Sequence, residues 1–181
     1  MAEESTNGQG GDAQSANGDA QAAAQRQAQP QNLGVLAQYV KDLSFENPGA
    51  PGSLRGRTGN PNIAITIDVR PGPVTNDEAE VELRLDAKAT TGDEVIFAIE
   101  LVYAGLFRLN NIPADAVQPI LRIECPRLLF PFARQILADS SRNGGFPPLL
   151  IDPIDFVGLY RQRLMEAQAA AQRAGGGPQT A

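Results

Sequence analysis

The sequence predicts an α+β fold in which a four-stranded antiparallel sheet is followed by helices. In four segments between residues 33 and 103, apolar residues alternate with polar ones, a pattern typical of half-buried strands. After residue 114 the apolar residues follow helical spacing instead. Strands that precede helices, without alternating with them, favour an α+β arrangement over a parallel sheet.

The first two strands are expected on either side of a crossover at residues 47–61 that is rich in proline and glycine. In the first strand one face is expected to carry the apolar residues Leu33, Val35, Ala37, Tyr39, Leu43 and Phe45. In the second strand the apolar face is expected to consist of Ile63, Ile65, Ile67 and Val69. Both segments therefore predict half-buried strands.

The third strand, residues 78–89, alternates most regularly, and its polar face is expected to contact water. The fourth strand, residues 94–103, is apolar on one side and partly apolar on the other. Four residues, Thr90 to Asp93, separate the two strands and include Gly92. So short a connection predicts an antiparallel hairpin of strands three and four.

Helical spacing begins weakly at residues 114–123 and becomes clear from Pro126 to about Arg142. Proline suits the first turn of a helix, and Gly144 is expected to end this one. A last helix is expected to begin near Asp152, with its carboxylate as the N-cap.

Three segments follow from the composition. Residues 1–32 are mostly Ala, Gln, Gly, Asn and Ser. They contain too few apolar side chains to offset the entropic cost of ordering the chain, so this composition predicts a disordered tail. Residues 33–166 form the predicted folded domain. Residues 167–181 predict a flexible tail, whose Ala/Gln portion extends the last helix until the glycines near residue 175 stop it.

Charge and composition exclude several function classes. The net charge of −6 argues against a nucleic-acid binder, because affinity for phosphate backbones comes mainly from Lys and Arg. The chain lacks histidine and has one cysteine, Cys125, so His/Cys zinc sites and Ser-His-Asp triads cannot be assembled within it. No apolar run reaches the length of a membrane span, and the first residues do not resemble a signal peptide. We expect a cytoplasmic protein.

Four stretches of the sequence are distinctive: KDLSFENPGAP at 41–51, AIELVYAGLF at 98–107, CPRLLFPFAR at 125–134 and GGFPPLLIDPIDF at 144–156. Together and in this order, they resemble the SecB family of bacterial export chaperones. The resemblance extends over about residues 35–164, nearly the whole predicted fold. Several stretches that occur in the same order as in the family identify it far more specifically than one short match would.

The resemblance implies an ATP-independent holdase that binds non-native precursor proteins in apolar grooves and delivers them to the SecA ATPase. It also implies a homotetramer built as a dimer of dimers, with no enzymatic activity, no cofactor and no insertion into the membrane. The residues from 168 onward do not repeat the tail that gives some members a second SecA contact. An alternative is a dedicated binding module, such as an antitoxin-linked chaperone, on the same scaffold.

The family's acidic contact with SecA corresponds to Asp42, Glu46 and Glu100, all of which are acids here. Ordinary solubilising charge is the competing interpretation for any exposed acid. The resemblance favours the contact with SecA. Electrostatics is consistent with it, because a broad acidic face attracts a basic partner.

Client binding and assembly correspond to apolar positions. The client-binding positions implied by the resemblance are Ile63, Ile65, Ile67, Phe156, Leu159, Tyr160 and Leu164. The oligomer-interface positions that it implies are Leu129, Phe132 and Ile136. For the client-binding positions, burial in the core or at a subunit interface is an equally good interpretation. For the three interface positions, burial purely in the core is the competing interpretation.

Two sites for chemistry are disfavoured. Glu78, Glu80, Glu82 and Asp86 could include an acid/base pair, but their even spacing places them on the wet side of a strand. Cys125, just before Pro126, is interpreted as a helix N-cap or a small buried residue in preference to a reactive thiol. No catalytic or metal-binding residue is assigned.

Overall fold

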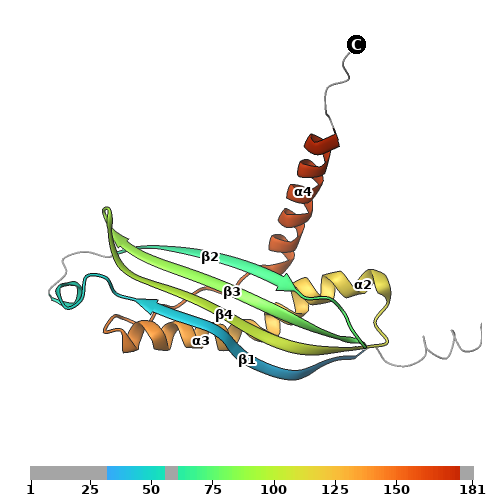
Figure 1. Cartoon of the computed structure of the whole chain (residues 1–181), viewed down its shortest axis with the longest axis horizontal. Helices are drawn as coiled ribbons and strands as arrows, with labels where there is room; N and C mark the ends of the chain where they lie inside the picture. Colours follow the sequence, from blue (N-terminus) through green and yellow to red (C-terminus); the bar gives the residue numbers. More distant parts are fainter. Residues whose placement is uncertain (1–31, 56–60, 176–181) are drawn as a thin grey trace, which may run out of the picture.

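In the computed structural model, which describes residues 32–55 and 61–175, four antiparallel strands form one long, curved sheet (Figure 1). The strands are β1 (Asn32–Glu46), β2 (Asn62–Pro71), β3 (Glu78–Thr91) and β4 (Glu94–Asn110). Their order in the sheet is β1-β4-β3-β2, so β1 and β2 are the edges. A short 3-10 helix, η1 (Gly52–Leu54), lies in the β1–β2 connection. The predicted antiparallel sheet and the β3–β4 hairpin are confirmed.

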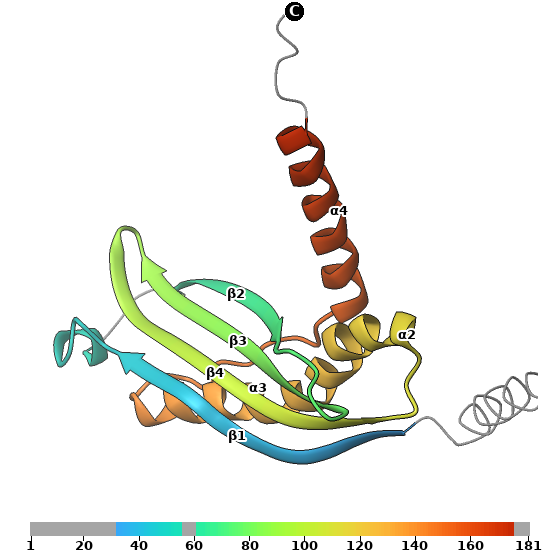
Figure 2. The same ribbon diagram turned by 45° about the vertical axis from the view of Figure 1, so that its right-hand side comes forward.

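The helices follow the sheet, as predicted. They are α2 (Ala114–Pro119), the π-helical turn η2 (Ile120–Glu124), α3 (Cys125–Asn143) and α4 (Phe156–Gly175). Helix α3 packs against β3, β4 and part of β1, whereas α4 projects away from the body of the molecule (Figures 1 and 2). Helix α3 therefore covers one face of the sheet, and the core lies between them. We call this the covered face and the opposite one the open face.

Alternation along β3 builds the core. The side chains of Val81, Leu83 and Leu85 have no exposed surface, and they pack with Leu121 and Leu129 from the helices. Burial of an apolar side chain of this size contributes roughly 1.5 to 3 kcal/mol, so this layer stabilises the attachment of the helices to the sheet.

The expected single apolar face of β1 is wrong. Bulges between Val35 and Ala37 and between Val40 and Asp42 each shift the register against β4 by one residue. Because side chains alternate between faces, each shift reverses the orientation of the residues that follow. Ala37 and Tyr39 consequently lie opposite Leu106 and Ala104 on the open face, not on the covered face.

The predicted start of the last helix is also wrong. Helix α4 begins at Phe156, and Asp155 is its cap in place of Asp152, because Asp155 Oδ1 accepts hydrogen bonds from the amides of Val157 (3.1 Å) and Gly158 (3.0 Å). A side-chain oxygen before a helix commonly satisfies these amide groups in this way. The sequence Asp-Pro-Ile-Asp offers two such carboxylates, and the structure uses the second.

The predicted N-terminal tail lies almost wholly outside the described residues, as do residues 176–181. Residues 167–175 belong to α4, which agrees with the predicted helical extension through the Ala/Gln stretch. Within the described ranges, no helix is both long enough and apolar enough to cross a membrane.

Candidate functional site

Acidic side chains gather at one end of the open face. Glu100 on β4 lies opposite Ser44 on β1, so Asp42 and Glu46, two residues to either side of Ser44, are its diagonal neighbours. Diagonal neighbours across a strand pair are about 7 to 8 Å apart. The structure therefore brings the three predicted partner-binding acids together, and all three are exposed.

Asp86 is a fourth acid of this cluster, and it was not among the predicted partner-binding residues. It lies directly opposite Glu100 on the other neighbouring strand, β3, and is also exposed. In the described part of the chain, no basic side chain forms an ion pair with Asp42, Glu46, Asp86 or Glu100. We call these four residues the acidic quartet. Like charges directly opposite each other destabilise a strand pair, so the quartet is a locally unfavourable arrangement for the isolated chain.

The other acids of the open face are neutralised by basic partners. Lys41, which the second β1 bulge turns toward β3, contacts Glu80 at 2.8 Å and Glu82 at 2.7 Å. The Tyr39 hydroxyl donates a hydrogen bond to Glu80 as well. Hydrogen bonds from Lys41 hold the pKa of Glu80 and that of Glu82 below their ordinary value, and the same bonds raise the pKa of Lys41.

Glu78 is paired too, with Arg108 at 2.6 Å. The expectation that these strand acids are simply solvated is therefore incomplete, because three of the four are ion-paired. The quartet therefore presents negative charge that no ion pair of the described residues neutralises.

An uncovered apolar strip runs along the first half of β2, on the covered face of the sheet. Ile63 and Ile65 pair with the buried residues Ala89 and Ala87, yet their own exposed fractions are 41% and 37%. The strip continues through the half-buried Ile67 to Val69, which is buried where η2 packs against β2. We call Ile63, Ile65 and Ile67 the β2 strip. It combines an accessible start with an end anchored in the core.

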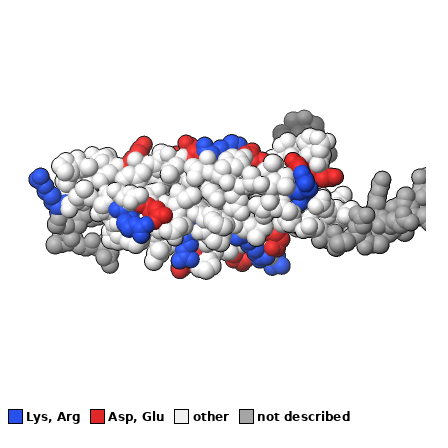
Figure 3. All heavy atoms as spheres, turned by 90° about the horizontal axis from the view of Figure 1, so that it is seen from below, with Lys and Arg blue, Asp and Glu red and all other residues white. Residues whose placement is uncertain are grey.

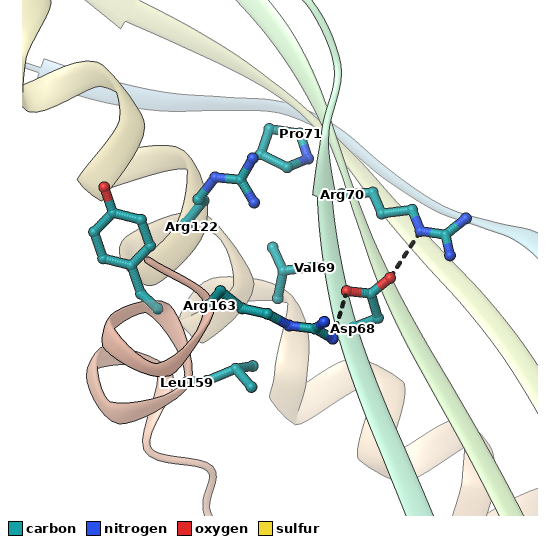
Figure 4. A pocket seen from close by; sticks show the side chains of 8 residues that line it. Asp68, Val69, Arg70, Pro71, Arg122, Leu159 and Arg163 are labelled. Atoms are coloured by element: carbon teal, nitrogen blue, oxygen red, sulfur yellow. Dashed lines mark hydrogen bonds and ion pairs between the residues drawn. The ribbon is translucent and has the colours of Figure 1, made fainter. Parts of the chain in front are cut away.

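At its buried end, the β2 strip meets a cavity of about 330 Å³ at the base of α4 (Figure 4). The cavity is lined by Asp68, Val69, Arg70, Pro71, Arg122, Leu159, Tyr160 and Arg163. We call it the α4 pocket. It places Leu159 and Tyr160, both half-buried, next to β2, as a groove between the second strand and the last helix requires.

Phe156 does not belong to this groove. Its exposed fraction is 1%, and its ring packs edge-on against Phe130 in the core. The prediction of a client-binding role for Phe156 is therefore wrong, because a client cannot contact a side chain with almost no accessible surface. Leu164, two turns further along α4, is exposed but lies outside the α4 pocket.

The predicted interface residues of α3 divide in the same way. Leu129 has no exposed surface within the single chain, so its predicted interface role is wrong and it belongs to the core. Phe132 is 53% exposed and stacks against Tyr103, and Ile136 is half-buried. Exposed apolar residues of β1, including Val40 and Leu43, add to an accessible apolar surface. Viewed from below, from the side on which β1 lies in Figure 1, the molecule is largely uncharged (Figure 3).

Cys125 is fully buried at the start of α3, which agrees with the interpretation of this residue as a small buried side chain. Burial raises the pKa of its thiol to about 12. The thiol therefore stays protonated at neutral pH and is a poor nucleophile. In the described ranges, no three His, Cys, Asp or Glu side chains are grouped closely enough to hold a metal ion.

The fold is similar to that of a SecB-like chaperone from Mycobacterium tuberculosis, solved in complex with a peptide from an antitoxin. The TM-score is 0.52 at 15% identity, and the match covers 75% of this chain and 95% of the other. A likeness at this identity establishes the fold alone.

Sequence relatives are much closer. The chain is 58% identical over 147 residues to the protein-export protein SecB of Bradyrhizobium sp., a match covering 81% of this chain and 90% of the relative. It is 57% identical over 145 residues to the protein-export protein SecB of Mesorhizobium japonicum, covering 80% and 86% of the two chains.

An α+β scaffold with an acidic open face and an uncovered apolar strip, in a chain this similar to export proteins, defines an export chaperone. The family model described as preprotein translocase subunit SecB matches residues 25–167. The chain belongs to the SecB family.

Proposed function

We propose that this export chaperone works as a cytoplasmic, ATP-independent holdase that captures non-native precursor proteins on the β2 strip and the adjoining α4 residues. It acts without catalysis and without a cofactor, and it transfers its clients to SecA through the acidic quartet. The observation that supports this proposal is the placement of an uncovered apolar strip and an unpaired acidic cluster on opposite faces of one sheet.

Opposite faces allow two partners to bind together. A client held on the covered face leaves the quartet accessible, so SecA can dock before the client is released. Transfer then needs no free intermediate in which the client is exposed to aggregation.

A long strip suits clients of many sequences. One large apolar side chain contributes roughly 1.5 to 3 kcal/mol when buried, whereas micromolar affinity requires about 8 kcal/mol beyond the costs of association. Several client side chains must therefore bind at once. An extended strip accepts such a set more readily than a pocket shaped for one ligand.

Assembly as a dimer of dimers is part of the proposal. The exposed Phe132 on α3 and the exposed Val40 and Leu43 on β1 form apolar surface that a monomer would leave in water. Contiguous apolar surface of this kind commonly marks a protein interface. Phe132 and Ile136 remain the proposed interface residues of α3.

We expect the purified protein to delay refolding of a slow-folding precursor at near-stoichiometric ratios and without ATP. Spontaneous refolding, followed by fluorescence, gives the reference rate, and native mass spectrometry of the same sample gives the assembly state with and without client. A refolding rate unchanged across several clients would contradict the holdase function. A mass of one chain would contradict the tetramer.

Charge reversal of the quartet should separate SecA binding from client capture. Replacing Asp42, Glu46 and Glu100 with Lys is expected to weaken SecA binding about tenfold or more, because each reversal turns an exposed attraction into a repulsion. Binding of SecA is measured by interferometry at several salt concentrations, and the wild-type affinity should fall as salt rises.

The matched control makes the same change in net charge elsewhere on the molecule. Asp93, Asp115 and Asp152 are exposed acids outside the quartet, and their replacement with Lys should leave most of the SecA affinity. Equal losses in both triple variants would show that overall charge, not the quartet, attracts SecA. A loss of client capture in the quartet variant would contradict the separation of the two faces.

The alternative of an antitoxin-linked binding module is not favoured. The relatives at 54–58% identity are named as protein-export proteins. The antitoxin peptide belongs to a structure only 15% identical to this chain.

A further inference from the structure

A basic side chain stands beside the acidic quartet on the open face. The register of β1 against β4 passes from Val40 to Asp42 and skips Lys41, which is the extra residue of the second bulge. Lys41 directly precedes Asp42 of the quartet in the chain, yet it contacts Glu80 and Glu82 on β3 and not the quartet. The bulge therefore places a positive charge next to a cluster that needs a basic partner.

The small residue Ala104 on β4 makes room for these contacts. It lies opposite Tyr39 of β1 and opposite Glu82 of β3. Because β4 lies between β1 and β3, those two strands are about 10 Å apart, and only a long side chain crosses from one to the other. Ala104 has no exposed surface although it belongs to the open face, which agrees with its being covered by the side chains of Tyr39 and Lys41.

The contacts of Lys41 use its whole hydrogen-bonding capacity. Its Nζ lies 3.0 Å and 2.8 Å from the two carboxylate oxygens of Glu80 and 2.7 Å from Oε1 of Glu82. An ammonium group has three donors, so none is left for a partner protein. Oε2 of Glu82 is bound by Arg84 Nη2 at 3.1 Å. In the described part of the chain, Lys41 is the sole cation that forms an ion pair with Glu80.

Lys41 thereby limits the extent of the uncompensated negative charge. Asp42 of the quartet and Arg84 lie on either side of the same β4 residue, and Glu82 is two residues before Arg84. Without Lys41, negative charge would extend from the quartet along β3. A basic chain segment of no defined shape would then be attracted to several positions on the open face. Discrimination between partners requires that such competing positions are not attractive.

We propose that Lys41 is a specificity-determining residue of the open face, which confines basic partners to the quartet by neutralising the acids beside it. This inference rests on the proposed docking of SecA at the quartet and adds selectivity to it. The competitors that matter are basic stretches of non-native chains, because a chaperone meets many of them. A client held by such a stretch on the open face would block the surface that SecA needs.

A labelled decalysine peptide serves as the probe for an unstructured basic segment. Fluorescence anisotropy at low salt should show that Lys41→Gln binds decalysine about two to five times more tightly than the wild type, the range expected for the charge of one exposed ion pair. SecA affinity, measured by interferometry, should change by less than about twofold, because its docking depends on the quartet. The ratio of SecA affinity to decalysine affinity therefore falls.

Two variants control for charge and for size. Arg127→Gln makes the same change in net charge and also frees an acid, Glu124, which Arg127 contacts at 2.7 Å on the helical side of the molecule. It should keep the wild-type ratio. Lys41→Arg retains the positive charge and should also keep it. Circular dichroism and native mass spectrometry of each variant check that fold and assembly are unchanged.

An unchanged decalysine affinity in Lys41→Gln would overturn this inference and leave SecA docking at the quartet standing. Equal gains for decalysine and for SecA would also overturn it, because Lys41 would then weaken attraction without selecting a partner. A gain of the same size in Arg127→Gln would assign the effect to net charge and overturn it as well. If SecA does not bind the wild-type protein, the proposed docking itself is wrong and the inference falls with it.

Discussion

Gly105→Val is expected to lower the free energy of unfolding by about 3 kcal/mol or more, at the upper end of the cost of overpacking a core. Gly105 lies on the covered face of β4, directly beneath α3. A Cβ atom at this position would lie 2.7 Å from the ring of Phe107 and 2.8 Å from Leu129 Cδ2. Both neighbours have no exposed surface, so they have little room to move.

Denaturation with urea, followed by circular dichroism, measures this loss. Gly52→Val is the control, because a Cβ built at Gly52 meets no other described part of the chain within 4 Å beyond its immediate neighbours and the backbone of its own helical turn. Its effect should stay within about 0.5 kcal/mol, as is usual for surface changes. An unchanged midpoint for Gly105→Val would show that α3 is not held against the sheet by this close contact.

A double change separates the steric clash from the general effect of adding a side chain to the strand. Gly105→Ala and Leu129→Ala should each destabilise, but together they should cost less than the sum, because the smaller residue at 129 makes room for the new methyl group. Strict additivity would contradict the clash.

The double substitution Ile63→Asp and Ile65→Asp is expected to weaken client binding about a hundredfold. It removes the accessible apolar surface at the start of the β2 strip and requires a bound client to desolvate two carboxylates. Since each factor of ten in affinity corresponds to about 1.4 kcal/mol, a combined loss of about 2.8 kcal/mol is sufficient. The first measurement is the dissociation constant for a permanently unfolded client. The second is the delay that the chaperone causes in the refolding of the foldable form of the same client.

Ala64→Asp is the control on the same strand. Ala64 lies between the two isoleucines but belongs to the open face, opposite Lys88. Ala64→Asp introduces aspartate, the same poor strand former, but leaves the β2 strip unchanged. Client binding should therefore change little. If Ala64→Asp were as harmful as the double variant, strand damage would explain both and the strip would not be the client site.

Much of the fold follows from periodicity because the buried residues of β3 alternate without interruption. β1 could not be predicted as well, since two bulges reverse its faces and a bulge leaves no distinct pattern in a single sequence. β4 extends seven residues beyond the expected Tyr103, to Asn110. Gly105 obscured this extension, because a glycine in a strand usually indicates a break, whereas here it allows α3 to approach closely.

The candidate site was predictable in composition but not in geometry. Asp86 joins the quartet because the register of β3 against β4 shifts between Ala89 and Thr90. Counting back from the hairpin turn without that shift would place Asp86 opposite Ile99 instead of Glu100. The burial of Phe156 and Leu129, and the meeting of three arginines at α4, depend on how helices pack against the sheet, which spacing along the chain does not specify.

The interrupted β1 edge bears on a danger specific to a chaperone. A regular sheet edge offers a row of amide and carbonyl groups to which another strand can add, and unfolded chains are rich in segments able to do so. Repeated addition of this kind leads toward amyloid-like stacking. The two bulges divide β1 into regular stretches of four, four and five residues, each shorter than the roughly six or seven residues typical of segments that stack in this way. Addition of a further strand at β1 is therefore disfavoured, whereas β2, whose register against β3 is uninterrupted from Asn62 to Pro71, keeps a regular edge.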